Sequence, residues 1–294
     1  MGSRSQSAGL LVGAFVSVCA VVLARASMVV SLQAAPDAVD EQADPALLAT
    51  LMSEALAFPT ISGPAHGVAF DAFQAWHRAR FPAFHSALAL HKTRNHSWLF
   101  EWPGTDPSLA PVLFIAHQDV VPVEAGSERD WRYPPFSGAV APCGDWPGDC
   151  VWGRGAVDAK VAVLGLSHAV AELVRAGWAP RRTLYFWFSD DEEVGGASSV
   201  ALNRAWAAQG MEFAYIVDEG LAVTDGMVPG VLAPAALIGI AEKGHLMVEV
   251  EASGGMGHAS VPPPTTTVGD LSRAIAALEA RPFPAALDGP TEAM

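Results

Sequence analysis

The stretch TLYFWFSDDEEVGG spans residues 183–196 and determines the predicted fold. Its first part is a short apolar run rich in aromatic side chains, which is typical of a strand buried on both faces of a sheet. Acidic residues follow at once, from Asp190 to Glu193. The stretch therefore predicts a buried strand that brings a cluster of carboxylates to one edge of a sheet.

Two further apolar runs, residues 111–116 (PVLFIA) and 213–217 (FAYIV), have the same character. Between the three runs, residues 158–176 and 198–209 have apolar side chains at helical spacing. Strand and helix thus alternate along the chain, which predicts βαβ units. The expected fold class is α/β, with a mainly parallel sheet and helices on both of its faces.

The pattern changes after about residue 235. Residues 237–240 and 246–250 are predicted to be strands, and residues 268–280 are predicted to be a helix with one apolar stripe. These elements indicate the beginning of a second domain of α+β type. The predicted divisions are an N-terminal segment 1–44, an α/β domain 45–235 and the second domain 236–294.

The N-terminal segment contains an uncharged apolar run over residues 8–24 that is flanked by arginines. It fits a cleaved signal peptide, with the small-x-small site at residues 24–26, and equally a membrane anchor at the lower length limit. Residues 33–46 are acidic and proline-containing, which indicates a linker. Either alternative places the rest of the chain in the secretory pathway, secreted or anchored by one span, outside the cytosol. In that oxidising space Cys143 and Cys150 could form a disulfide, although two free thiols remain an alternative.

Composition restricts the classes of partner. The 294 residues are 51% hydrophobic and 16% charged, which indicates a packed core. The net charge of −14 argues against a nucleic-acid partner, because such partners need clustered Lys and Arg. The same acidity is compatible with metal cations, for which carboxylates are good ligands.

Acidic or imidazole side chains follow each apolar run. They are His117, Gln118 and Asp119 after the first run, Asp190 to Glu193 after the second, and Asp218 and Glu219 after the third. Each group alone would be explained by a hydrogen-bonded histidine or a solvated acidic turn. Parallel strands, however, gather all three groups at one edge, which Asp158 can also reach. So much negative charge needs cations, and zinc accepts mixed imidazole and carboxylate ligands. The sequence therefore predicts a metal site.

Five motifs in order resemble those of a known family. They are HQDVVP at 117–122, WGRGAVDAK at 152–160, DEEVGG at 191–196, DEG at 218–220 and GHAS at 257–260. The chain resembles the co-catalytic zinc peptidases and aminoacylases, which include carboxypeptidase S, glutamate carboxypeptidase and the N-acyl amino acid hydrolases. The carboxypeptidase S branch is the most similar, and the resemblance covers roughly residues 45–294. It implies a zinc exopeptidase catalytic domain followed by a lid and dimerisation domain.

The resemblance implies a site for two zinc ions, with Co²⁺ or Mn²⁺ as alternatives. His117 and Asp218 would bind one ion and Glu193 the other, while Asp158 would bridge both. The second ion would have fewer ligands than the usual four, and the family supplies a further His later in its chain. The resemblance thus implies that these 294 residues are an amino-terminal fragment, which would bind one metal poorly and have little activity.

The resemblance also implies catalytic roles. Glu192 would be the general base that takes a proton from water and passes it to the leaving amine. Asp119 would orient His117. His258, in the second domain, would stabilise the developing oxyanion, often across a homodimer interface.

Two functions remain open from the sequence. The first is a metal-dependent hydrolase that cleaves an amide next to a free carboxylate, with a peptide or an N-acyl amino acid as substrate. The alternative is a truncated and inactive membrane-tethered relative that binds peptide or a single metal. A metal titration and the substitution Glu192→Gln would distinguish them.

Overall fold

The computed structural model describes residues 2–28, 44–91, 93, 95–144, 146–221, 223–242, 244–255, 257–258, 260–286 and 289. Most of the predicted linker at 33–46 lies outside these residues. The chain divides into two compact units, Met1–Thr50 and Leu51–Met294. The first unit contains helix α1 (Gly2–Ser27), and helix α2 (Pro45–Leu56) crosses the boundary.

No helix in the described part of the chain has both the length and the apolar character that a membrane span requires. Residues 8–24 lie within α1, and the sequence left a cleaved signal peptide and a membrane anchor as the two alternatives for them.

A five-stranded sheet forms the centre of the second unit, with the order β1-β2-β6-β3-β7. The strands are β1 (Ala89–His91), β2 (Trp98–Trp102), β3 (Val112–His117), β6 (Leu184–Ser189) and β7 (Tyr215–Val217). β3 pairs in parallel with both β6 and β7, whereas β2 is antiparallel to β6 and to β1. Four of the five strands therefore run in the same direction, as the prediction of a mainly parallel α/β sheet requires.

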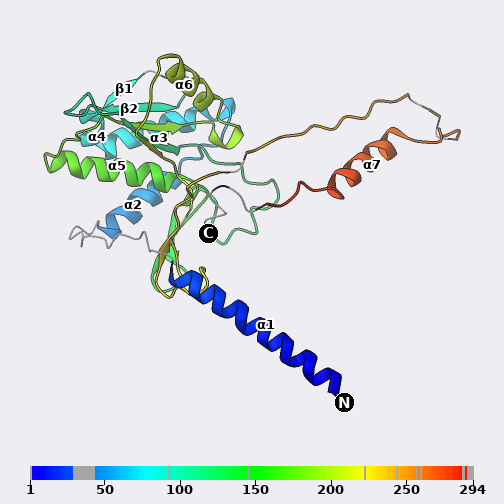
Figure 1. Cartoon of the computed structure of the whole chain (residues 1–294). Coiled ribbons are helices and arrows are strands. Elements are labelled where there is room, and N and C mark those ends of the chain that lie inside the picture. The colour runs from blue at the N-terminus through cyan, green and yellow to red at the C-terminus, as the bar shows by residue number, and fades with distance from the viewer. Residues whose placement is uncertain are drawn as a thin grey trace. The chain divides into compact units, whose positions relative to one another are not determined.

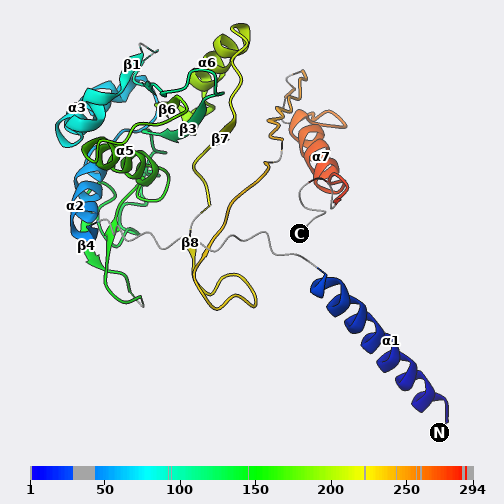
Figure 2. The same ribbon diagram turned by 60° about the vertical axis from the view of Figure 1, so that its left-hand side comes forward.

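Helices cover both faces of this sheet. Helices α3 (Gly67–Arg80), α4 (Pro82–Ala87) and α5 (Lys160–Arg175) contribute to the larger core, and α6 (Ala197–Ala208) packs on the other face. Figures 1 and 2 show β3 and β6 between α5 and α6. Alternate residues of β6 serve the two cores, because Phe186 and Phe188 face one and Trp187 faces the other. The aromatic run at 183–188 is thus apolar throughout because both of its faces are buried.

The remaining elements are short. They are the 3-10 turns η1 (Pro64–His66) and η2 (Glu192–Val194), the hairpin β4 (Ala139–Pro142) and β5 (Asp149–Trp152), the pair β8 (Val223–Thr224) and β9 (Ala235–Ala236), and α7 (Thr267–Glu279). Cys143 and Cys150 form a disulfide at the end of the β4–β5 hairpin, which decides between the disulfide and the two free thiols that the sequence left open. The Thr266 side chain accepts a hydrogen bond from the Gly269 amide and caps α7, so the predicted helix at 268–280 is also confirmed.

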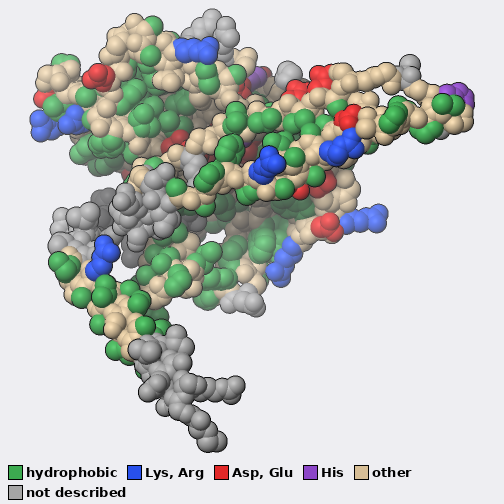
Figure 3. Space-filling model, turned by 45° about the vertical axis from the view of Figure 1, so that its right-hand side comes forward, with side chains coloured by type: hydrophobic (Ala, Val, Ile, Leu, Met, Phe, Trp, Pro, Cys, Tyr) green, Lys and Arg blue, Asp and Glu red, His purple; other side chains and the backbone are tan. Residues whose placement is uncertain are grey.

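The predicted strands at 237–240 and 246–250 are wrong for this structure. The described residues of both segments have no strand assignment and no partner strand. Ile238 and Met247 are 84% and 85% exposed. A strand without a partner leaves its backbone groups to water, so alternating side chains alone do not produce one. Figure 3 shows hydrophobic side chains over much of the visible surface.

Candidate metal centre

His117 ends β3 at the carboxyl edge of the sheet, and its side chain is only 1% exposed. Its Nδ1 donates a hydrogen bond to the main-chain oxygen of Asp119 at 2.9 Å. This bond leaves Nε2 free to face the carboxylates, as a metal-binding histidine requires. The Nε2 lies 2.9 Å from Oδ1 of Asp158.

The segment after β3 is fixed by a neighbouring loop. Ile61 forms an isolated parallel bridge with Val120. The Thr60 hydroxyl donates to the main-chain oxygen of Gln118 at 2.6 Å. The side-chain Nε2 of Gln118 in turn donates to the main-chain oxygen of Phe188 at 2.8 Å. Residues 118–120 are therefore held from both sides, and the buried Asp119 has a fixed position.

The Asp119 carboxylate joins the end of β3 to the turn that follows β6. It accepts hydrogen bonds from the amides of Glu192 at 3.2 Å and Glu193 at 3.1 Å, and from the Ser62 hydroxyl at 2.7 Å. The same carboxylate lies 3.4 Å from Nδ1 of His117. Asp119 thus contacts His117 through its main-chain oxygen and its carboxylate, and its role in orienting His117 stays a prediction. Its carboxylate also holds the backbone of η2, a contact that no sequence pattern predicted.

Asp158 lies in the turn between β5 and α5, and its peptide bond to Ala159 is cis. The turn needs glycine at Gly155, where φ is +83° and a Cβ would lie 2.6 Å from Cγ1 of Val120. Lys160, fully buried at the start of α5, donates from Nζ to the main-chain oxygens of Ala55 and Phe58 at 3.0 and 2.7 Å. Burial lowers the pKa of Lys160 to about 7. Its motif was recognised in the sequence, but its structural role was not.

The four acids after β6 divide into two pairs. Asp190 accepts hydrogen bonds from the His96 amide at 3.0 Å and from the Ser97 hydroxyl. Asp191 accepts one from the Ser198 amide at 2.9 Å, near the start of α6. These two acids are engaged in supporting the fold. Glu192 and Glu193 follow in η2 and make no such bonds through their side chains in the described structure, so they can face the site.

The structure brings together three of the four predicted metal ligands. Donor atoms of His117, Asp158 and Glu193 all lie within 4.8 Å of one another. The fourth, Asp218, lines a cavity of about 410 Å³ that His117 and Glu192 also line. Glu192 approaches His117 Nε2 to 4.0 Å through Oε2, next to the three ligands.

Glu219 is a candidate ligand that the sequence reasoning missed. Its Oε1 lies 3.6 Å from His117 Nε2. Asp218 instead accepts a hydrogen bond from the Glu219 amide at 2.9 Å. The signal in the sequence was the same for both, an acid directly after an apolar run, and only the backbone direction after β7 separates them. β7 was predicted to be buried on both faces, but its residues Tyr215–Val217 are exposed at the edge of the described sheet.

His258 is not brought to this cluster in the described residues. Its side chain is exposed, and its Nδ1 contacts the Ser260 hydroxyl at 2.8 Å within its own turn. The predicted oxyanion role therefore stays a prediction.

The charges of the cluster shift its pKa values. Burial lowers the pKa of His117, but the hydrogen bonds and charge of Asp119, with a bond to Asp158, outweigh burial and raise it to about 10. Burial raises the pKa of Glu192, and the charges of Asp119 and Asp158 raise it further. Burial and then the charge of Asp158 raise the pKa of Glu193. Without a metal ion, burial and mutual repulsion thus disfavour the charged forms of these carboxylates.

These donors fit a divalent cation. A buried imidazole and at least two carboxylates converge on one point, and nearby carboxylates repel one another unless positive charge separates them. Imidazole and carboxylate together are a ligand set that zinc accepts. Such a sheet, with this cluster at its carboxyl edge, defines an α/β protein with a candidate metal centre.

The chain belongs to peptidase family M20/M25/M40, which matches residues 113–290. It is 35% identical over 236 residues to the N-fatty-acyl-amino acid synthase/hydrolase PM20D1 of Mus musculus, an alignment that covers 78% of this chain and 45% of the relative. It is 39% identical over 208 residues to carboxypeptidase S of Saccharomyces cerevisiae, covering 69% of this chain and 34% of the relative. The resemblance to carboxypeptidase S and the N-acyl amino acid hydrolases is thus confirmed. The chain spans less than half the length of these two relatives.

Two solved structures are similar over part of the chain. Human carnosine dipeptidase 1 aligns with a TM-score of 0.47 and 20% identity, over 61% of this chain and 40% of its own. An M20 family metallo-carboxypeptidase from Sulfolobus solfataricus aligns with a TM-score of 0.48 and 20% identity, over 62% of this chain and 38% of its own.

Proposed function

We propose that the protein is a metal-dependent hydrolase that cleaves an amide next to a free carboxylate, in a dipeptide or an N-acyl amino acid. The observation that carries this proposal is the convergence of His117, Asp158 and Glu193 at the carboxyl edge of the sheet, with Glu192 beside them. The names of the relatives, carboxypeptidase S and N-fatty-acyl-amino acid synthase/hydrolase, support the same substrate class.

His117, Asp158 and Glu193 would hold the metal, with Asp158 in the bridging position of a two-ion site. Zinc suits this donor set, and Co²⁺ and Mn²⁺ are alternatives. The bound metal would supply Lewis-acid polarisation of the amide carbonyl and would lower the pKa of water.

Glu192 is the proposed general base. It would accept a proton from the attacking water and donate it to the leaving amine. Burial raises the pKa of Glu192, and a raised pKa favours proton uptake by a general base. Asp119 fixes the Glu192 amide at 3.2 Å, so the position of the base depends on the same carboxylate that supports His117.

Asp218 is the proposed further ligand of the first ion, and Glu219 is the second candidate for this position. The 3.6 Å separation of Glu219 from His117 Nε2 supports the second candidate, because the structure gives Asp218 no comparably short approach to that nitrogen in the described residues. Zinc titration of Asp218→Asn and Glu219→Gln separates them, because the ligand's variant should lose affinity about 10-fold or more.

The domain plan, dimer and location are further proposals. We propose that residues 236–294 begin a lid domain that forms a homodimer and brings His258 to a neighbouring site. The exposed Val268, Ile275 and Leu278 on α7 support an apolar contact. Light scattering of the purified chain tests it, since a monomer at all concentrations would contradict it. The Cys143–Cys150 disulfide supports a location in the secretory pathway.

Hydrolysis by zinc-loaded chain tests the proposed reaction. The wild type is assayed with dipeptides and N-acyl amino acids beside Glu192→Gln and the matched control Glu212→Gln, which changes an exposed glutamate outside the cluster. We expect weak activity in the wild type, as the resemblance implies for these 294 residues, with equal activity in the control and a loss of about 10²- to 10⁴-fold in Glu192→Gln. Equal activity in Glu192→Gln would refute the role of the base. Zinc binding without any hydrolysis by the wild type would favour the binding-only alternative.

A further inference from the structure

A second cavity lies outside the metal cluster, beside the β4–β5 hairpin. Its volume is about 540 Å³, within the usual range for small-molecule sites. Its lining is mainly apolar and aromatic, and the residues that matter here are Trp131, Arg132, Tyr133, Trp152 and Val157. We call it the Arg132 pocket.

The pocket combines aromatic rings with positive charge. The guanidinium of Arg132 lies over the rings of Trp152 and Tyr133, at 5.5 and 5.9 Å from their centroids. The guanidinium of Arg154 lies 5.0 Å from the centroid of Trp131. Cation–π contacts of this kind orient an arginine but do not neutralise its charge.

Neither arginine has a carboxylate partner in the described part of the chain. The arginine ion pairs found there involve other residues. The Nε of Arg154 is also buried and has no hydrogen-bond acceptor among the described residues. Asp130 also lines the pocket but forms no ion pair with either arginine, so two guanidinium groups leave positive charge beside one apolar pocket, which suits an anion.

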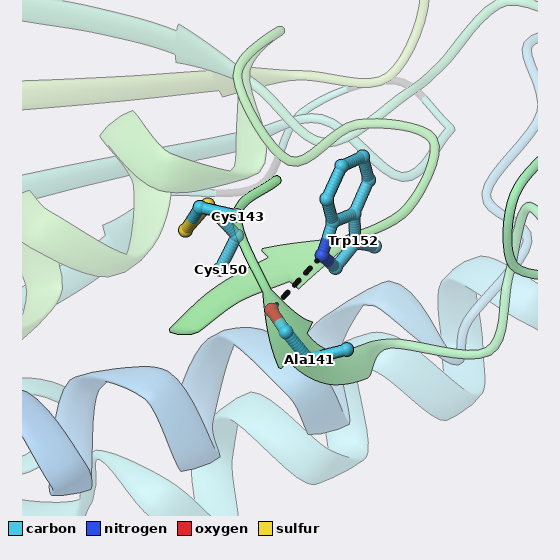
Figure 4. The surroundings of a disulfide bond; sticks show 4 residues. All are labelled: Ala141, Cys143, Cys150 and Trp152. Atoms are coloured by element: carbon cyan, nitrogen blue, oxygen red, sulfur yellow. Dashed lines mark hydrogen bonds between the residues drawn. A yellow bond between two sulfur atoms is a disulfide. The ribbon is translucent and has the colours of Figure 1, made fainter. Parts of the chain in front are cut away.

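The walls of the pocket are fixed by the fold. The disulfide between Cys143 and Cys150 closes the hairpin from which Trp152 extends, and the Trp152 Nε1 donates to the Ala141 oxygen at 3.2 Å (Figure 4). The Arg154 amide donates to the Pro135 oxygen at 2.7 Å. Binding to such a site requires little ordering of side chains, which favours affinity.

We propose that the Arg132 pocket binds an amphipathic carboxylate, whose apolar group packs against Trp152 and Tyr133 while its carboxylate pairs with Arg132. Arginine suits this role because its planar fork matches a carboxylate. A carboxylate with an aromatic group and one with an aliphatic group both fit this description. One probe of each kind distinguishes the two ligand classes.

The pocket and the metal centre are linked along the chain. Val157 lines it and directly precedes Asp158, so the two sites share one turn of chain, with consecutive Cα atoms about 3.8 Å apart. The interpretation of the bound carboxylate as substrate rests on the proposed function. The binding itself does not.

Calorimetry on metal-free full chain tests the binding without the catalytic centre. The aromatic probe is N-benzoylglycine and the aliphatic probe is N-octanoylglycine. Benzamide lacks the carboxylate, and acetate lacks the apolar group. We expect saturable binding of one or both acylglycines and at least about tenfold weaker binding of benzamide and of acetate. Absence of saturable binding by both acylglycines would overturn the proposal.

Variants locate the binding. Arg132→Gln should weaken acylglycine binding at least about tenfold, while the matched control Arg129→Gln, an exposed arginine that does not line the pocket, should not. Tyr133→Leu should weaken it as well, and circular dichroism verifies that each variant is folded. Unchanged affinity in folded Arg132→Gln would overturn the proposal.

The two proposals fail separately. Arg132-dependent binding in a chain that hydrolyses nothing when loaded with zinc would leave the pocket standing and refute the proposed function. Hydrolysis by a chain that binds no acylglycine in its metal-free form would refute the pocket and leave the proposed function standing.

Discussion

The substitution Asp119→Asn should destabilise the protein although it changes no shape. The carboxylate accepts from the Glu192 amide through Oδ1 and from the Glu193 amide and Ser62 hydroxyl through Oδ2. An asparagine offers one oxygen and one NH₂ group in the same place. One backbone N–H must then face a donor and lose its acceptor.

The magnitude follows from these bonds. A hydrogen bond to a charged group contributes about 1.5–3 kcal/mol, and a buried donor without a partner adds a penalty. We therefore expect Asp119→Asn to lower the free energy of unfolding by about 2–4 kcal/mol. Ser62→Ala removes one neutral donor and should cost about 1 kcal/mol.

Urea denaturation of metal-free protein, followed by circular dichroism, measures the effect. The control is Asp225→Asn, an exposed aspartate. Burial raises the pKa of Asp119, but the bonds from His117 and Ser62 outweigh it, so the pKa lies below its usual value. The stability contributed by this group is therefore present above about pH 4 and is lost as the pH falls through the lowered pKa. A change within about 0.5 kcal/mol of the control at pH 7 would refute the reasoning.

Three further perturbations have expected outcomes. Lys160→Met removes the charged donor that the Ala55 and Phe58 oxygens share, although each oxygen keeps a backbone donor. It should lower the free energy of unfolding in urea by about 1.5–3 kcal/mol, and an unchanged free energy would contradict this. Gly155→Ala forces a Cβ within 2.6 Å of Val120 and strains a positive φ, so thermal denaturation should show a loss of about 1–3 kcal/mol. Burial lowers the pKa of His85 to about 4, and burial with the charge of His85 lowers that of His77. The stability from these neutral histidines is present above about pH 6.5 and is lost as the pH falls toward 4, so His85→Gln should flatten that part of the stability profile.

The sequence was a good guide to elements buried on both faces. The runs that became β3 and β6 are continuously apolar, because each face of the central sheet carries a core. The antiparallel pairing of β2 with β6 was not predicted. It depends on contacts between residues more than eighty positions apart, which leave no periodic signal in either segment.

The candidate site was predicted in part. His117 ends β3, while Glu192 and Glu193 follow β6, and parallel pairing brings such positions to one edge. Asp158 reaches the same edge from the turn before α5. Ser62 was missed because only the bridge between its loop and Val120 brings it to Asp119, and it follows no apolar run.

Two other residues show the limits of motifs. Lys160 stands in a recognised motif, yet its burial and its two carbonyl partners depend on a loop about a hundred residues earlier. Glu219 differs from Asp218 only by one position, and the direction of each side chain after β7 is a property of the backbone.

Calorimetric titration with zinc tests the central claim most directly. The metal-free wild type is compared with His117→Gln, which removes the imidazole, and with Glu192→Gln, which removes only the proposed base. We predict that the wild type binds zinc and that His117→Gln loses at least about tenfold in affinity. Glu192→Gln should bind zinc as the wild type does. A wild type that binds no zinc, or a His117→Gln variant that binds it equally well, would contradict the assignment of this cluster as a metal centre.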